Sequence, residues 1–244
     1  MSELVTNLAR VRERMARAAA RAGRNHQDIT LVAVSKTRPA ETIREAYHAG
    51  VRHFGENRVQ EWESKQAALS DLDATWQLIG HLQSNKARRA AGLFHSVDSV
   101  DSVALAQKLN SALADMASEG SGKTSLGVLI ELRVSSEETK TGAEVADLPA
   151  LVEAVLALPH LELRGLMCVP PFFDDAEKAR PFFRRLREAR DALRAHLGSE
   201  SPRPGGESFL AELSMGMSHD FEAAIEEGAT QVRVGSAIFG ARTA

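Results

Sequence analysis

Residues 29–50 read ITLVAVSKTRPAETIREAYHAG and set the pattern that the rest of the chain repeats. The run Ile29–Val34 is short, apolar and rich in β-branched residues, as expected of a strand that is buried on both faces. Apolar residues then recur at helical spacing through Ala40–Ala49. A buried strand followed by an amphipathic helix is the repeating unit of a parallel sheet covered by helices.

The same alternation continues to the end of the chain. Further strands are predicted at Arg52–Phe54, Trp76–Ile79, Phe94–Val97, Leu126–Val134, Leu161–Met167, Glu212–Ser214 and Gln231–Val234. Further helices are predicted at Arg58–Ala68, Ser99–Met116, Leu148–Leu156, Asp175–His196 and Asp220–Glu227. This pattern predicts an α/β protein with a single (β/α)8 TIM-type barrel over residues 1–244. A doubly wound open sheet is the alternative.

The first residues predict an extra helix in front of the barrel. Leu4, Leu8, Val11 and Met15 form an apolar stripe at helical spacing. Charged residues interrupt this segment where a secretory signal needs its apolar stretch. We therefore expect a packed N-terminal helix and a cytoplasmic protein.

Composition excludes several classes of function. Lys+Arg at 30 and Asp+Glu at 33 give a net charge of −3, which indicates neither a nucleic-acid nor an acidic-membrane partner. No apolar run approaches the roughly 20 residues that a membrane-spanning helix needs. The single cysteine and the lack of HExxH spacing among the histidines predict no metal site.

Lys36 follows Ser35 at the C-terminal end of the first predicted strand. Side chains at the C-terminal ends of barrel strands line the active site in this fold. The turn Thr37–Pro39 opens the next helix, so the lysine lies at a tight junction at the barrel mouth. The alternative is a lysine that leaves the strand and reaches solvent.

Two loops late in the chain predict an anion site. Gly216 lets the backbone approach a ligand closely, and Ser218 can cap the next helix while its hydroxyl faces the ligand. Gly235 and Ser236 open a short helical turn after the eighth strand. Barrels often bind phosphate with these two loops, whereas plain helix capping is the alternative for each.

A mouth lysine opposite a phosphate site fits a phosphorylated aldehyde held as a Schiff base. A free lysine, with a pKa of about 10.4, is neutral in only about one molecule in a few thousand at pH 7. Desolvation and nearby cations, for which Arg38 and Arg233 are candidates, would favour the neutral amine. Pyridoxal 5'-phosphate is the common cofactor that fits.

Several longer motifs make the hypothesis more specific. They are Val34–Thr37, His53–Glu61, Trp76–Lys86, Gly165–Met167, Leu213–Ser218 and Val232–Gly240. Together they resemble the pyridoxal phosphate homeostasis protein family over nearly the whole chain. The resemblance implies a single-domain barrel similar to the N-terminal domain of alanine racemase. It also implies a role in storing, carrying or buffering the cofactor.

The resemblance further implies roles for individual residues. Lys36 would form the Schiff base, Arg233 would face the pyridine nitrogen, and Asn57 would lie near the cofactor ring. His81 and Met167 would be wall residues, with core packing as the alternative. The phosphate would be held by the two late loops through Gly216, Met217, Ser218, Gly235 and Ser236.

Two departures from the family pattern put a second cofactor site in doubt. The position two after the Schiff-base lysine is often lysine in the family and is Arg38 here. The chain ends at Ala241–Ala244 without the lysine-bearing tail of some relatives, although Lys140 is retained.

A pyridoxal phosphate-dependent, racemase-like enzyme is the main functional alternative. Racemisation needs an acid/base group on each face of the substrate. In the racemase the second group is a tyrosine from another subunit's added domain, whereas the only tyrosine here, Tyr47, lies in a predicted barrel helix. Arg233 would also discourage protonation of the ring nitrogen. We therefore expect a carrier with no catalytic residue.

The expected partners are the small-molecule cofactor and apo-enzymes that receive it. A scaffold that has lost cofactor binding is a third hypothesis. The intact Lys36 and the phosphate loops argue against it.

Overall fold

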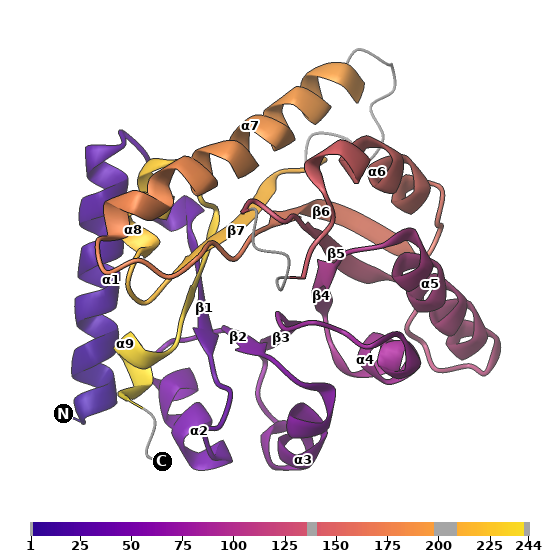
Figure 1. Ribbon diagram of the computed structural model, residues 1–244. Coiled ribbons are helices and arrows are strands. Elements are labelled where there is room, and N and C mark those ends of the chain that lie inside the picture. Colours follow the sequence, from indigo (N-terminus) through magenta and orange to yellow (C-terminus); the bar gives the residue numbers. More distant parts are fainter. Residues whose placement is uncertain (1, 136–140, 198–208, 242–244) are drawn as a thin grey trace.

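The strands form a closed parallel barrel. The computed structural model describes residues 2–135, 141–197 and 209–241. Each strand pairs with the next in chain order, and the last pairs with the first (Figure 1). The strands are β1 (Thr30–Val34), β2 (His53–Glu56), β3 (Thr75–Leu78), β4 (Ser96–Val100), β5 (Leu126–Glu131), β6 (Leu161–Met167), β7 (Glu212–Met217) and β8 (Gln231–Val234). Closure confirms the (β/α)8 prediction and excludes an open, doubly wound sheet.

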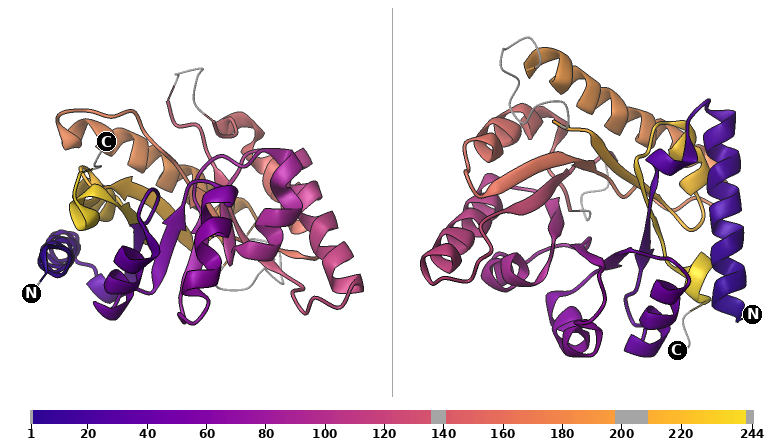
Figure 2. Two further views of the ribbon diagram at one scale, coloured as in Figure 1. Left: turned by 90° about the horizontal axis from the view of Figure 1, so that it is seen from below. Right: turned by 180° about the vertical axis from the view of Figure 1, so that it is seen from behind.

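Helices surround the strands on the outside of the barrel (Figure 2). They are α1 (Glu3–Arg21), α2 (Ala40–His48), α3 (Val59–Leu69), α4 (Ala87–Leu93), α5 (Val103–Ser118), α6 (Leu148–Leu156), α7 (Arg180–Leu197), α8 (Phe221–Glu226) and α9 (Ser236–Phe239). Short 3-10 helices lie at η1 (His26–Asp28), η2 (Ser84–Lys86), η3 (Val145–Asp147) and η4 (Ala176–Ala179). The apolar core lies between this ring and the strands.

The predicted N-terminal helix is present as α1. Its apolar stripe is buried, and the helix packs against α8 and α9. Figure 1 shows these short C-terminal helices beside it. The guanidinium of Arg14 also donates to the Glu222 carboxylate at 2.8 Å. The long helix α1 thus covers the side of the barrel where β8 pairs with β1.

Element boundaries differ from prediction mainly around β4 and α4. The strand predicted at Phe94–Val97 is β4, Ser96–Val100, so α5 begins at Val103 after the N-cap Ser102 rather than at Ser99. All five β4 residues are buried although three are polar, so a search for apolar runs does not detect the whole strand. Sequence analysis missed α4, whose seven residues are too few for a clear period.

The helix predicted from Asp175 begins later. Residues Ala176–Ala179 form η4, and α7 starts at Arg180. The Asp175 carboxylate accepts the backbone N–H of Glu177 at 3.1 Å, and this cap belongs to the 3-10 turn. The Gly-, Ser- and Pro-rich stretch Gly198–Ser208 predicts a surface loop, and it lies outside the described residues.

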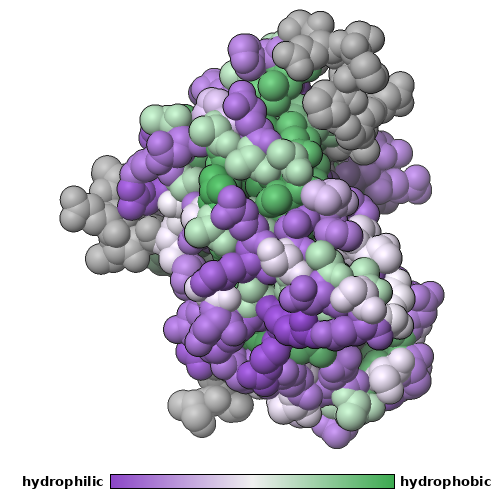
Figure 3. Space-filling view, turned by 90° about the vertical axis from the view of Figure 1, so that its right-hand side faces the viewer, coloured by the Kyte–Doolittle hydropathy of each residue, from purple (hydrophilic) through white to green (hydrophobic). Residues whose placement is uncertain are grey.

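Apolar side chains gather toward the top of the face shown in Figure 3, where Figure 1 places α6. This helix has nine residues, and Glu153 is its only charged one.

Among the described helices, none is both long enough and apolar enough to cross a membrane.

Gly165 allows β6 to lie unusually close to β7. A Cβ atom built on Gly165 would stand 1.9 Å from the backbone oxygen of Glu212, its register partner. The contact is with backbone, so no side-chain rotation could relieve it. The two strands would have to separate.

We predict that Gly165→Ala lowers the free energy of unfolding by about 1–3 kcal/mol, because overpacking strains the sheet. Urea unfolding followed by circular dichroism measures it. Gly92→Ala is the matched control, since its added methyl meets only the flexible end of Met116. Equal midpoints for Gly165→Ala and the wild type would contradict the prediction.

Candidate cofactor-binding site

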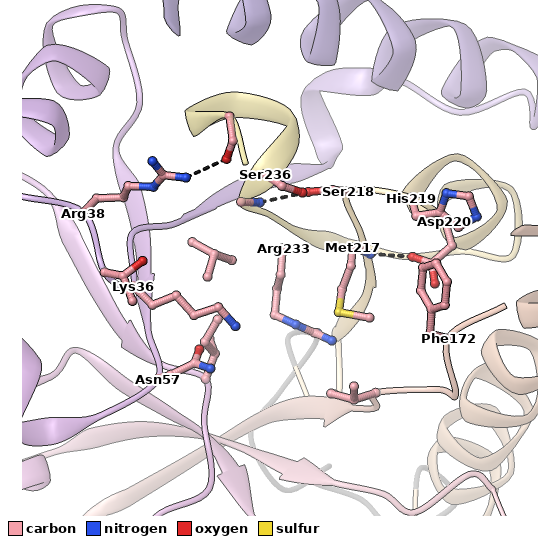
Figure 4. A pocket seen from close by; sticks show the side chains of 16 residues that line it. Lys36, Arg38, Asn57, Phe172, Met217, Ser218, His219, Asp220, Arg233 and Ser236 are labelled. Atoms are coloured by element: carbon pink, nitrogen blue, oxygen red, sulfur yellow. Dashed lines mark hydrogen bonds between the residues drawn. The ribbon is translucent and has the colours of Figure 1, made fainter. Parts of the chain in front are cut away.

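A cavity of about 380 Å³ opens at the C-terminal ends of the strands. Its size falls within the range of roughly 300–1,000 Å³ that is usual for small-molecule sites. Most of the predicted site residues line it, as Figure 4 shows: Lys36, Asn57, Met217, Ser218, Arg233, Gly235 and Ser236. Residues from β1, β2, β7 and β8 and their following loops therefore meet in one place.

Lys36 occupies a tight turn after β1. The turn is closed by the backbone N–H of Arg38, which donates to the Ser35 oxygen at 3.1 Å. The half-buried side chain of Lys36 points into the cavity, with Asn57 and Arg233 nearby (Figure 4). This agrees with the predicted mouth position and not with a lysine that extends into solvent.

Arg38 is directed elsewhere. Its Nη2 donates to the backbone oxygen of Gly240 at 2.6 Å and to that of Ala241 at 3.2 Å. The guanidinium was a candidate cation beside the Lys36 amine, but in the structure it holds the turn after α9. Both side chains line the cavity, but Figure 4 shows Arg38 ending beside α9 and Lys36 ending near Asn57 and Arg233.

Ser218 joins the two late loops. Its Oγ accepts the backbone N–H of Gly235 at 3.1 Å and that of Ala237 at 3.2 Å. An oxygen atom thus rests on two backbone donors at the cavity wall, which is the contact that a phosphate oxygen would make there. A phosphate oxygen would replace the Ser218 hydroxyl as the acceptor of these two N–H groups.

The predicted helix cap is wrong. The N-cap of α8 is Asp220, two residues after Ser218. The Asp220 carboxylate accepts the backbone N–H of Met217 at 2.6 Å, which folds the loop back on itself. The Ser218 hydroxyl is therefore directed to the loop after β8 rather than to α8.

Gly216 does not line the cavity. Its φ is +90°, and a Cβ atom there would lie 2.5 Å from the Ala224 Cβ and 2.9 Å from the Phe221 Cα. The close approach predicted at Gly216 is thus to helix α8 rather than to a ligand. The glycine shapes the loop that carries Met217 and Ser218.

Arg233 lies at the base of the cavity and is 4% exposed. Its Nη1 donates to the Ser214 Oγ at 2.7 Å, and its Nη2 donates to the backbone oxygen of Cys168 at 2.8 Å. Burial lowers the pKa of the guanidinium, while nearby acidic groups, including Asp98, act in the opposite direction. An arginine keeps its charge in such surroundings.

Buried carboxyl groups lie around this cation. Asp98 is 1% exposed, and its Oδ1 accepts the Ser96 hydroxyl at 2.6 Å. Its Oδ2 has no hydrogen-bond partner among the described residues. Burial raises the pKa of Asp98 to about 7 and also raises the pKa of Glu131. Both acids therefore keep their protons to a higher pH than exposed carboxyl groups do.

Several cavity residues had no signal in the sequence. The loops after β6 and β7 contribute Val169, Phe172 and His219. Phe172 is 73% exposed, and its ring centroid lies 5.3 Å from that of His219. The pair Phe172–Phe173 suggests core packing from the sequence, and only the fold shows that Phe172 is instead exposed at the cavity rim.

The two proposed wall residues are not among the residues that line the cavity. Met167 is completely buried at the end of β6, in agreement with the core-packing alternative. His81 lies with its Nδ1 3.5 Å from the Asp101 carboxylate and its side chain 48% exposed.

Comparisons with known proteins now identify the family. The family model described as "Alanine racemase, N-terminal domain" matches residues 6–243. The chain is 46% identical over 242 residues to the pyridoxal phosphate homeostasis protein of Pseudomonas aeruginosa, covering 99% of this chain and 97% of the relative. The chain belongs to the pyridoxal phosphate homeostasis protein family.

Other members of the family and solved structures agree. The Aquifex aeolicus member is 45% identical over 240 residues, with 96% of each chain covered. PipY of Synechococcus elongatus, solved with PLP bound, superposes with a TM-score of 0.80 at 38% identity, covering 98% of this chain and all of PipY. Alanine racemase of Clostridium difficile shares the fold at 12% identity and a TM-score of 0.71, with all of this chain and 58% of the racemase covered.

Of the positions considered for a second cofactor site, Arg38 binds the turn after α9. Lys140 and the residues after Ala241 lie outside the described part of the chain.

We predict that Asp98→Asn flattens the pH dependence of stability. The native Asp98 carboxyl keeps its proton to about pH 7, whereas its ordinary pKa is 3.8. The native state therefore binds more protons between these values, and the free energy of unfolding falls as pH rises from about 4 to about 7. In the variant, the free energy of unfolding should therefore decrease less over this pH range, by an amount on the order of a few kcal/mol.

Urea unfolding at about pH 5 and about pH 8 measures this effect. Asp115→Asn, on the exposed surface of α5, is the control. Glu131 and Glu212, whose pKa values burial also raises, keep part of the dependence in place. An unchanged pH dependence in Asp98→Asn would contradict the prediction.

Proposed function

We propose that this protein binds pyridoxal 5'-phosphate in the cavity and takes part in storing, carrying or buffering it. One observation carries the proposal. Lys36 lines the same cavity as Ser218 and Gly235, and the Ser218 hydroxyl oxygen there accepts the backbone N–H groups of Gly235 and Ala237. An amine and an anion site in one cavity match the aldehyde and the phosphate of this compound.

Different residues of the chain would bind the aldehyde, the phosphate and the ring of the cofactor. Lys36 would supply the amine that holds the cofactor through its aldehyde. Met217, Ser218 and the backbone around Gly235 and Ser236 would hold the phosphate, with Gly216 shaping their loop. Asn57 and Arg233 would lie beside the ring. The relative PipY has been solved with PLP bound, which supports binding of this cofactor.

The position of Asn57 is built into the fold. A Cβ atom on Gly80 would stand 2.3 Å from the Asn57 backbone oxygen, so the loops after β2 and β3 touch through their backbones. This contact keeps Asn57 at the cavity wall. It also gives a physical reason for glycine in the segment Trp76–Lys86.

We further propose that the protein is a carrier rather than an enzyme. Arg233 keeps a positive charge at the cavity base, which would discourage protonation of the ring nitrogen and weaken its capacity to accept electrons. Tyr47 lies on α2, where the Arg52 guanidinium carbon stands 4.1 Å from the centroid of the Tyr47 ring. Tyr47 is not among the residues that line the cavity. A racemase-like enzyme remains the alternative hypothesis.

We predict that borohydride reduction of the loaded protein fixes the cofactor on Lys36. The reduced adduct is mapped by peptide mass spectrometry, and binding is followed by the absorption band of the Schiff base. Lys36→Ala should lose the adduct and at least about tenfold in affinity, while keeping weak binding through the phosphate loops. Lys108→Ala, on the exposed face of α5, should behave as the wild type. Unchanged labelling of Lys36→Ala would contradict the assignment.

We predict that racemisation and decarboxylation of amino acids stay at the level of free pyridoxal phosphate. Chiral chromatography of the amino acids after long incubation measures this. The Lys36→Ala variant shows whether any residual turnover depends on the cavity. Wild-type turnover near the roughly 10 s⁻¹ of a typical enzyme would favour the racemase-like alternative.

Delivery of the cofactor to apo-enzymes and a cytoplasmic location stay predictions from the sequence.

A further inference from the structure

The turn that carries Lys36 rests on a network of charged groups behind the cavity. Lys65, on α3, is 11% exposed at its side chain. Its Nζ donates to the Ser35 backbone oxygen at 3.1 Å, to Glu56 Oε1 at 3.2 Å and to Glu61 Oε1 at 2.6 Å. One ammonium group thus contacts the turn itself and two carboxylates.

Each carboxylate holds one neighbour of Lys36. Glu56 Oε1 accepts the Ser35 hydroxyl at 2.7 Å, and the Glu56 side chain is completely buried. Glu61 Oε1 accepts the backbone N–H of Thr37. The residues before and after Lys36 are therefore both tied to groups that Lys65 binds.

Thr37 needs such support because of its backbone conformation. Its φ is +63°, and it occupies the third position of the turn closed by Arg38 and Ser35. Turns with positive φ at this position usually have glycine there, and a β-branched residue is disfavoured. The Glu61 carboxylate compensates by accepting the N–H that this conformation directs toward α3.

The charges in the network depend on one another. Burial alone would raise the pKa of Glu61, but the hydrogen bonds from Lys65 and Thr37 outweigh it, so the pKa is lowered. Burial raises the pKa of Glu56, and the nearby Lys65 opposes that rise. Removing the ammonium would therefore weaken both carboxylate contacts to the turn.

We propose that Lys65 is a positioning residue that fixes the Lys36 amine for bonding to an aldehyde. This inference rests on the proposed function. In that bond the Lys36 Nζ attaches to the aldehyde carbon, and the aldehyde oxygen leaves as water. The angle of approach depends on where the turn holds Nζ. Lys65 does not line the cavity and touches neither phosphate loop, so it acts on the aldehyde end alone.

The test compares two ligands that differ only at the aldehyde. Lys65→Met removes the charge and keeps the apolar part of the side chain. It should bind pyridoxal 5'-phosphate at least about tenfold more weakly than the wild type. Pyridoxine 5'-phosphate, with an alcohol in place of the aldehyde, should bind both proteins within about twofold of one another. Isothermal titration calorimetry measures both affinities.

Arg44→Met is the matched control for loss of an ion pair. Arg44 lies on the neighbouring helix α2 and binds Asp71 at 2.6 Å without contacting the Lys36 turn. It should leave both affinities unchanged. If Lys65→Met lost affinity for both ligands equally, or for neither, the positioning role would be overturned.

Two further variants keep the test decisive if Lys65→Met does not fold. Glu61→Gln keeps an oxygen for the Thr37 N–H but removes the charge that pairs with Lys65, so it should show a smaller loss with the same ligand selectivity. Adding Thr37→Gly should restore part of that loss, because glycine adopts the turn conformation without strain.

The Lys36→Ala background separates this inference from the proposed function. There, Lys65→Met should have no further effect on binding of pyridoxal 5'-phosphate, since no amine remains to be positioned. An additional loss of fivefold or more, on the order of 1 kcal/mol, would mean that Lys65 acts elsewhere. A wild-type protein that binds neither ligand would instead reject the proposed function itself.

Discussion

Pairing of the first strand with the last is the constraint on which the site depends. In the β1–β8 ladder, Val32 lies opposite Arg233 and Ala33 lies opposite Val234. Lys36 lies two residues after the end of β1, and Ser236 lies two residues after the end of β8. This register therefore brings Lys36 beside the loop that begins with Gly235 and Ser236. If the sheet kept this strand order but stayed open, Lys36 and the loop after β8, about 200 residues apart in the chain, would lie on opposite edges.

Closure also explains the polar interior. The Gln77 amide donates to the Gln231 oxygen at 3.5 Å, although β3 and β8 are not neighbours, so the bond crosses the barrel. Arg233 likewise reaches past β7 to the backbone after β6. Such contacts replace the usual layers of branched apolar side chains near the base of the cavity. They hold a cation there that bulk apolar packing could not stabilise.

The sequence predicted those parts of the protein that depend on local pattern. Strands such as Leu161–Met167 and the mouth position of Lys36 follow from apolar runs and from what comes after them. The cap at Asp220 was missed because Ser218 is an equally good capping residue, and only the distance between two loops decides which group each side chain binds. The role of Lys65 was missed because a lysine four residues after a glutamate is usually a solvent-exposed helical pair.

The proposed carrier role requires that the protein bind the cofactor tightly and also release it, and the cavity suggests how both requirements are met. Two modest attachments on one ligand bind tightly together, because each keeps the other end at high effective concentration. Water that reached a Schiff base on Lys36 would hydrolyse it and leave only the proposed phosphate contacts. An enzyme of this fold would gain from excluding that water. Here the rim residue Phe172 stands 73% exposed beside His219 rather than folded over the amine. An open rim and a firmly held lysine together favour reversible binding over chemistry on the bound compound.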